Sequence, residues 1–285
     1  MGPGSAVVVL GLASALTWGA ADFGGGMLSR RAPLFGVVAG TQLIGMVAAL
    51  ALGIVRGEPV PQGPDVLWSM AAGICGMVGI TSLYRGLAVG RMGVVAPTTG
   101  VLAAIVPVVV GFMLEGVPQQ TTVVGIATAL IAVVLVTRSP GHDDGRPSGA
   151  QWALLAGAAI GGFNVCIGQI SDAGAFGPLV IIRLVQAVVL AVLIVAWRQP
   201  WRMGRAVAPR LAVIGLLDMA GNATFIVATQ TGQLAIAAVL SSLYPVVTVL
   251  LAITVLRERV TRSHVAGIVL TGVAIALIAA GSATA

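Results

Sequence analysis

The chain alternates between long apolar runs and short polar connections from one end to the other. Ten of the runs reach or approach about 20 residues, the length that a helix needs to cross the hydrocarbon core of a bilayer. Membrane-spanning β-strands would be about 10 residues long and would alternate in polarity, which these runs do not do. The pattern predicts an all-α integral membrane protein with ten transmembrane helices. We expect these helices near residues 5–27, 33–54, 66–86, 92–114, 119–137, 150–170, 177–197, 210–230, 233–256 and 264–282.

The two halves of the chain repeat one another at a single offset of 142 residues. Three glycines recur at that offset: Gly19, Gly90 and Gly125 return as Gly161, Gly232 and Gly267. Each half holds five apolar runs, so the second copy must enter the membrane from the opposite face. This predicts a 5+5 inverted repeat, with a substrate site near the bilayer midplane between the halves. We expect a first repeat at 1–137, a linker at 138–149 and a second repeat at 150–285.

Composition supports membrane insertion and excludes other classes. Hydrophobic residues make up 58% of the chain and charged residues 8%, whereas soluble domains carry roughly a quarter charged residues. The basic residues are all arginines, and they form no contiguous stripe of the kind that nucleic-acid binding needs. Cys75 and Cys166 lie singly within apolar runs. His142, Asp143 and Asp144 lie in the polar linker, where solubilisation explains them better than metal binding. We expect no metal and no cofactor.

The arginines predict an orientation. Of the 15 arginines, Arg183 lies within an apolar run and Arg56 lies on the side of the N-terminus. The other thirteen fall on the opposite side: Arg30, Arg31, Arg85, Arg91, Arg138, Arg146, Arg198, Arg202, Arg205, Arg210, Arg257, Arg259 and Arg262. Short loops rich in arginine stay cytoplasmic. The imbalance therefore predicts that both termini lie outside the cytoplasm.

The motifs that carry a family resemblance lie in both halves. They are Trp18-Gly19-Ala20-Ala21-Asp22-Phe23, Leu83-Tyr84-Arg85-Gly86-Leu87-Ala88, Pro107 with Glu115 and Gly125, and Leu243-Tyr244-Pro245-Val246-Val247 with Glu258 and Gly267. In order and repetition they resemble the EamA-type ten-span members of the drug/metabolite transporter superfamily. The resemblance implies a 5+5 inverted repeat that moves small metabolites, often outward. It also implies cytoplasmic termini, contrary to the arginine count.

The prolines depart from the repeat. Pro107 lies 17 residues after Gly90, but Pro245 lies 13 residues after Gly232, which differs by about one helical turn. Since proline kinks a helix at its own position, we expect the two corresponding helices to bend at different depths.

Four ionisable residues lie within apolar runs, where a charge costs about 2.5–3.5 kcal/mol on insertion scales and therefore faces protein or water. They are Asp22, Arg85, Arg183 and Asp218. We favour a structural ion pair between Asp22 and Arg85. The alternative makes Asp22 or Asp218 a proton-coupling carboxylate, whose protonation removes a charge that is costly in low dielectric. Asp218 could also neutralise an arginine, and Arg183 could bind substrate or extend to the interface.

Other polar and aromatic residues within the runs are candidates for substrate binding. They are Trp18, Gln42, Tyr84, Asn164, Gln186, Asn222 and Tyr244, which join Asp22, Arg183 and Asp218 in the expected site. Asn164 corresponds to Asp22 in the repeat, so this position is polar in both halves. Aromatic side chains in the cavity would suit amphipathic or aromatic substrates, although simple packing explains them equally well.

The leading functional hypothesis is a secondary transporter, by alternating access, of small metabolites or drugs. We expect a multi-pass protein of the plasma (inner) membrane, with the lipid bilayer and a small molecule as partners. Protons could serve as the coupling ion, and oligomerisation is not required. The alternatives are a membrane-embedded enzyme and a structural membrane protein. No phosphate-binding Gly-Lys-Ser motif, HExxH zinc pair or nucleophile–base set supports an enzyme, and buried charges argue against a scaffold.

Overall fold

The computed structural model describes residues 3–29, 31–89, 92–137, 149–171, 174–255 and 262–283, and these residues form helices and connections without a strand. The first half contains α1 (Pro3–Ser29), α2 (Leu34–Arg56), α3 (Pro64–Val89), α4 (Met92–Glu115) and α5 (Gln120–Thr137). The second half contains α6 (Ala150–Gly168), α7 (Phe176–Trp197), the 3₁₀ helix η1 (Arg205–Val207), α8 (Ala208–Thr231), α9 (Leu234–Ser241), α10 (Tyr244–Val255) and α11 (Arg262–Ala283). Most of the expected linker, residues 138–148, lies outside the described residues.

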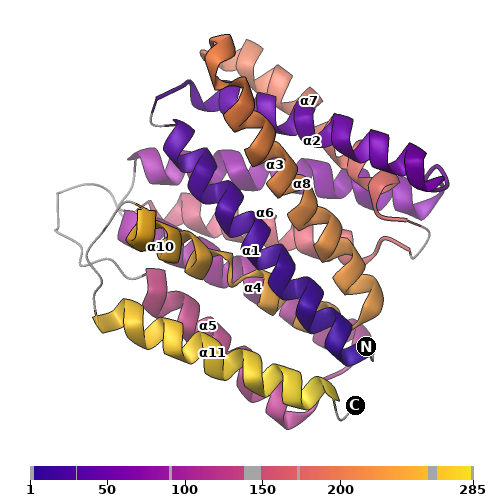
Figure 1. Cartoon of the computed structure of the whole chain (residues 1–285), viewed down its shortest axis with the longest axis vertical. Coiled ribbons are helices and arrows are strands. Elements are labelled where there is room, and N and C mark those ends of the chain that lie inside the picture. Colours follow the sequence, from indigo (N-terminus) through magenta and orange to yellow (C-terminus); the bar gives the residue numbers. More distant parts are fainter. Residues whose placement is uncertain are drawn as a thin grey trace.

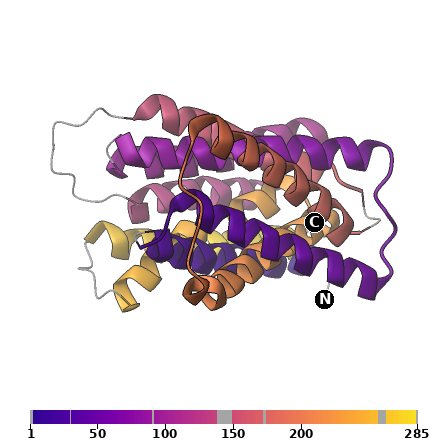
Figure 2. The ribbon, with the colours of Figure 1, turned by 90° about the horizontal axis from the view of Figure 1, so that it is seen from above.

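Within the described residues, seven helices are long and apolar enough to cross a membrane: those of α1, α2, α3, α4, α6, α7 and α8. Two shorter apolar segments, Gln120–Leu135 and Val265–Ile278, lie in α5 and α11. All of these helices run roughly along one common direction (Figure 2). Apart from the run at 233–256, the predicted apolar runs therefore fold as single helices among the described residues, and seven helices are long enough to span a membrane.

The expected helix at 233–256 is two helices. α9 ends at Ser241 and α10 begins at Tyr244, so Ser242 and Leu243 interrupt the run. Pro245 follows directly, and a proline lacks the N–H that would continue the helical hydrogen bonding. α4 instead continues past Pro107 to Glu115. We expected the two corresponding helices to bend at different depths. The difference is larger, since α4 is continuous and its counterpart is broken into α9 and α10.

The most extensive helix contacts join the two halves rather than helices of one half. They are α5 with α11, α1 with α8, α3 with α6, α4 with α6, α1 with α9 and α10, α2 with α7 and α8, and α3 with α7. Exchanging every helix for its counterpart maps these pairs onto one another: α1 with α8 becomes α6 with α3. Figure 1 shows α1 and α8 side by side, with α2 and α7 at one edge and α5 and α11 at the other.

One pair of the repeated glycines lies where helices of the two halves approach closely. A Cβ on Gly19 of α1 would lie 2.5 Å from Cβ of Val247 in α10. A Cβ on Gly161 of α6 would lie 2.5 Å from Cβ of Val106 in α4. Small residues at such positions let membrane helices approach closely. The glycine that the repeat preserves is therefore a packing residue at two equivalent crossings.

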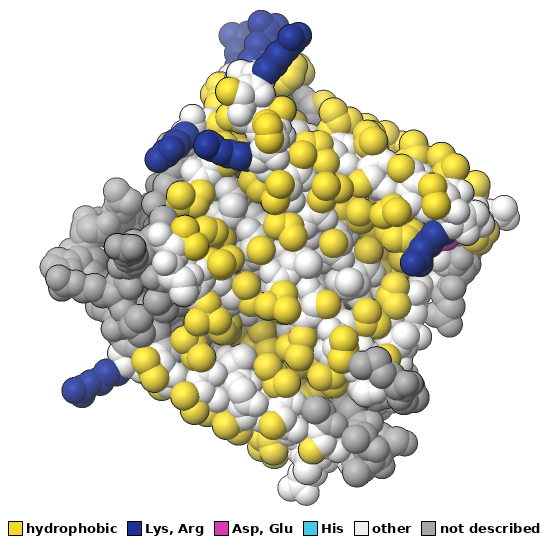
Figure 3. Space-filling model, viewed as in Figure 1, with side chains coloured by type: hydrophobic (Ala, Val, Ile, Leu, Met, Phe, Trp, Pro, Cys, Tyr) yellow, Lys and Arg dark blue, Asp and Glu magenta, His cyan; other side chains and the backbone are white. Residues whose placement is uncertain are grey.

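The helix ends define two faces of the molecule. The terminal face carries the start of α1, the end of α11 and the connection at 57–63, and lies toward the right of Figure 1. The arginine face is the opposite one, where α1 and α3 end and α8 begins. All described arginines except Arg183 are exposed, and only Arg56 of these is on the terminal face. Figure 3 shows arginines at the margins and hydrophobic side chains between them.

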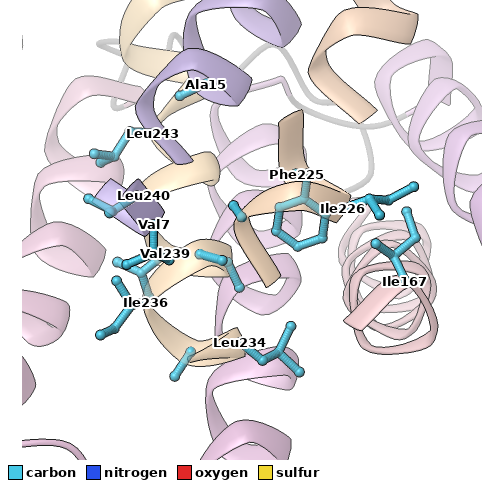
Figure 4. Close-up of a cluster of buried hydrophobic side chains, with 14 of the residues drawn as sticks. Val7, Ala15, Ile167, Phe225, Ile226, Leu234, Ile236, Val239, Leu240 and Leu243 are labelled. Carbon is cyan, nitrogen blue, oxygen red and sulfur yellow. The ribbon is translucent and has the colours of Figure 1, made fainter. Parts of the chain in front are cut away.

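The tightest hydrophobic core lies toward the terminal face. Every residue of α9 is buried, and the α9 side chains contact α1, α4 and α8. Figure 4 shows Val7, Phe225, Ile226 and Leu234 in this cluster, and each of them is less than 2% exposed. The region around α9 is therefore densely filled, while a hollow bordered by Pro59, Pro61 and Gly174 lies at the surface of the terminal face.

The glycine crossings predict a difference in stability between two similar substitutions. Gly161→Ala forces a Cβ against Val106 and should lower the free energy of unfolding by about 1–3 kcal/mol, the usual cost of overpacking. Gly272→Ala is the control, because nothing lies within 4 Å of a Cβ there. Thermal unfolding of the purified protein in detergent measures both. Equal midpoints for the two variants would contradict this role of Gly161.

Candidate functional site

A polar cavity lies at mid-depth between the halves and contains about 850 Å³ of empty space, its open mouth included. Its lining comes from seven long helices, from the break between α9 and α10 and from the first residue of α10. The lining residues are Trp18, Asp22, Gln42, Gly76, Ile80, Leu83, Ala103, Ile160, Phe163, Asn164, Arg183, Gln186, Asp218, Asn222, Ser242 and Tyr244. Most of its polar groups lie near the middle of their helices. An apolar bundle therefore encloses a polar compartment at the depth where burying polar groups is most costly.

Nearly all of the residues expected to bind substrate line this one cavity. Asp22 and Asn164, which correspond in the repeat, both do so, as do the paired candidates Gln42 and Gln186. The side chain of Tyr84 lies outside the described residues. Arg85 is exposed and borders a different hollow between α2, α3 and α7.

Arg183 is the centre of the polar network. Its side chain is only 3% exposed, and Nη2 forms an ion pair with Oδ2 of Asp218 on α8. Nη1 donates to Oε1 of Gln42 on α2 and, at 3.2 Å, to Oε1 of Gln186. Asn222 Nδ2 donates to the carbonyl oxygen of Asp218 at 2.7 Å. A buried charge requires a partner and hydrogen bonds, and three helices from both halves supply them.

The two carboxylates of the cavity differ in their partners. Asp218 forms an ion pair with Arg183. This neutralisation of an arginine is one of the two roles that the sequence left open to Asp218. Asp22 is exposed within the cavity that it lines, and no hydrogen bond or ion pair reaches it in the described part of the chain. The ion pair expected between Asp22 and Arg85 is not formed among the described residues, because the two side chains border different hollows. Among the described residues, Asp22 is therefore the carboxyl group of the cavity without an ion-pair partner.

Aromatic rings and small residues shape the walls. The ring of Trp18 lies 5.6 Å from that of Phe225, centroid to centroid, tilted by 41°. A Cβ on Gly221 would lie 2.5 Å from Cδ1 of Trp18, and a Cβ on Gly76 would lie 2.6 Å from Nε2 of Gln186. These two glycines leave the space that the Trp18 indole and the Gln186 amide occupy.

Sequence reasoning missed several residues of the lining. Ser242 enters the cavity because the helix breaks there, and its Oγ donates to the carbonyl oxygen of Ala238 at 2.7 Å. Pro245, three residues later, was the available signal for that break. Phe163 and Gly76 carried no such signal, since apolar and small residues inside an apolar run look alike whether they face lipid or a cavity.

Three acidic side chains of the first half close the terminal face by accepting hydrogen bonds from backbone N–H groups of the second. Glu115, at the end of α4, accepts from Leu234 N at 2.8 Å. Glu58 accepts from Phe176 N at 2.8 Å. Asp65 accepts from Ser171 N at 3.0 Å and from Ser171 Oγ at 2.5 Å. The bonds to Phe176 and Leu234 satisfy free donors at the first residues of α7 and α9, where negative charge is favourable, whereas Ser171 lies in the connection between α6 and α7.

Comparison with known proteins gives the family. The sequence profile of the EamA-like transporter family matches twice, over residues 5–138 and 147–280. The chain belongs to the EamA-like transporter family. It is thus a multi-pass protein of a transporter family within the drug/metabolite transporter superfamily, as the motifs and the repeat predicted.

The fold of this EamA-like protein recurs among solved structures. One crystal structure, described only as that of a protein, superposes with a TM-score of 0.73 at 20% sequence identity. The superposition covers 98% of this chain and 96% of the other. Comparison with curated proteins finds no match. At that level of identity the likeness concerns the fold alone.

The buried ion pair predicts a double-mutant effect. Asp218→Asn leaves the Arg183 charge unpaired and should lower the free energy of unfolding by about 3 kcal/mol, the lower end of the range for a broken buried pair, because the Asp218 side chain is 31% exposed. Adding Arg183→Met should restore most of the loss. Thermal unfolding in detergent compares the stability of wild type, Asp218→Asn and Asp218→Asn/Arg183→Met. Arg85→Gln, which removes an exposed arginine, is the control. An additive loss in the double variant would contradict the pairing.

Proposed function

We propose that this protein is a secondary transporter that moves a small metabolite or drug across the plasma membrane by alternating access. The observation that carries the proposal is the mid-depth polar cavity, whose charged and amide side chains come from both halves. When a site lies at the midplane between two repeats, rocking of one repeat against the other exposes that site to each side of the membrane in turn.

The architecture that we propose is ten crossings in a 5+5 inverted repeat, with repeats at 1–137 and 150–285. The set of helix contacts supports it, because exchanging the halves maps the contacts onto themselves as a two-fold axis between them requires. The broken pair α9 and α10 then serves together as one crossing, and α5 and α11 pair across the axis.

In this arrangement the protein is closed on the terminal face and open toward the arginine face. Support comes from the filled core around α9 and from the three acid–backbone contacts on the terminal side. Two further hollows border residues at the arginine-face ends of helices, among them Arg31, Arg85 and Arg210. If the arginine face is cytoplasmic, this is the conformer in which an exporter would take up its substrate.

A membrane-embedded enzyme or a structural membrane protein receives less support. Among the described lining residues, the guanidinium is already paired, and the Ser242 hydroxyl donates to a backbone carbonyl oxygen rather than to a base. A scaffold would have no use for an unpaired carboxylate at mid-depth. Binding and release of a polar molecule explain both features.

Transport in proteoliposomes tests the proposal. The probes are labelled amino acids, nucleobases and sugars, offered to wild type, to Gly76→Trp and to protein-free vesicles. Gly76→Trp fills the cavity, whereas Gly272→Trp, on an open helix surface, is the matched control. We expect uptake of at least one probe by wild type and the control only. Equal uptake by the Gly76 variant would contradict transport through this cavity.

The unpaired carboxylate predicts how transport is driven. If Asp22 carries the coupling proton, Asp22→Asn abolishes uptake driven by a pH gradient but leaves exchange of labelled for unlabelled substrate intact, since exchange moves no net proton. The Asn side chain keeps the size and the hydrogen-bonding capacity and removes only the titratable charge. Gradient-driven uptake at the wild-type rate in Asp22→Asn would exclude this role for Asp22.

The arginine imbalance predicts the orientation in the membrane. Impermeant maleimide applied to intact cells should label a cysteine appended to the C-terminus and spare Gly204→Cys, in a background with Cys75 and Cys166 replaced by alanine. Gly204 lies in the exposed connection before η1. Labelling of position 204 with a shielded C-terminus would reverse the orientation, in favour of the cytoplasmic termini that the family resemblance implies.

A further inference from the structure

A second hollow lies between α1 and α8 at the arginine face, apart from the central cavity. It contains about 1090 Å³ of empty space, open side included. Its lining consists of Phe23, Gly24, Met27, Leu28, Arg31, Pro209, Arg210, Val213 and Ile214. Figure 1 shows α1 and α8 side by side, one helix from each half of the chain.

The polar groups of this hollow are gathered at one end. Arg31 follows the end of α1 and Arg210 lies in the first turn of α8, so both side chains lie at the arginine face. The apolar lining extends inward to Phe23, which lies about 9 Å deeper than the end of α1 at a rise of 1.5 Å per residue. The hollow is thus cationic at the membrane surface and apolar toward the membrane interior.

The two arginines have no acidic partner. Both are exposed, none of the lining residues is acidic, and no ion pair reaches either arginine in the described part of the chain. Two guanidinium groups on one hollow repel each other unless an anion lies between them. Guanidinium groups bind phosphate oxygens through paired hydrogen bonds.

The internal repeat indicates that the fold does not require these charges. At the offset of 142 residues, Arg31 corresponds to Ala173 and Arg210 corresponds to Trp68. The equivalent crossing of α3 and α6 therefore has no arginine at either position. The pair is a property of this end of the molecule alone.

We propose that this hollow binds an anionic phospholipid, with the phosphate headgroup on Arg31 and Arg210 and an acyl chain along Phe23, Met27 and Val213. The two arginines at the membrane surface match an anionic headgroup. The apolar lining deeper in the hollow matches an acyl chain, which a soluble phosphate does not have. Because α1 and α8 belong to different halves, the bound lipid bridges them and stabilises the conformer seen here. The proposal rests on membrane insertion and does not depend on transport.

Lipid titration of the purified protein in detergent tests the site. Phosphatidylglycerol and phosphatidylcholine with identical acyl chains are added in turn, and the apparent Kd is taken from the rise in the unfolding temperature. We expect the apparent Kd for phosphatidylglycerol to be about 30-fold higher in Arg31→Gln/Arg210→Gln than in wild type. This factor corresponds to roughly 1 kcal/mol of binding free energy per arginine near an anionic headgroup. Arg205→Gln/Arg262→Gln is the control, with the same net charge and two exposed arginines outside the hollow.

A second variant keeps both charges and removes the space. Val213→Trp fills the hollow from its exposed side and should also abolish the response to phosphatidylglycerol. Full retention of that response in Val213→Trp or in Arg31→Gln/Arg210→Gln would overturn the proposal. So would equal stabilisation by phosphatidylcholine, an equal loss in the control, or the same stabilisation by inorganic phosphate, which would identify a soluble anion rather than a lipid as the ligand.

Discussion

A guanidinium buried at mid-depth is the constraint on which the site depends. Arg183 is nearly inaccessible to solvent, so its charge must be matched inside the protein. Asp218 supplies the opposite charge from α8, and Gln42 supplies an oxygen from α2 in the other half. These bonds fix α2, α7 and α8 relative to one another at the depth of the cavity. They also pair Asp218, whereas no ion pair reaches Asp22 among the described residues.

The two faces of the bundle are held by different forces. On the terminal face, close packing around α9 combines with three carboxylates that accept from backbone N–H groups across the halves. On the arginine face, the same helices border hollows and carry exposed, like-charged side chains. Alternating access would require the acid–backbone contacts to break while the arginine face closes. Hydrogen bonds to backbone N–H groups suit such a change, since water can replace them.

The sequence predicted most of the helices because the apolar runs are long, and it selected residues that line one cavity because charge is costly in lipid. Gly19 and Gly161 recur because equivalent helix crossings need them. The partner of each charge was not predictable, because it depends on which faces of neighbouring helices are turned toward one another. Asp22 and Arg85 were expected at a similar depth in the membrane, but they border different hollows. The break at Ser242 also escaped, since Pro107 in α4 shows that a proline alone does not end a helix.

Accessibility on the two sides of the cavity tests alternating access most directly. Ser241→Cys, at the end of the buried α9, and Leu83→Cys, in the cavity toward the arginine face, are made in a protein with Cys75 and Cys166 replaced by alanine. Each is treated with impermeant maleimide from its own side in proteoliposomes. The account predicts that position 83 reacts and position 241 does not at rest, and that turnover makes position 241 reactive while slowing position 83. Reactivities that rise together, or that do not change during turnover, would contradict it.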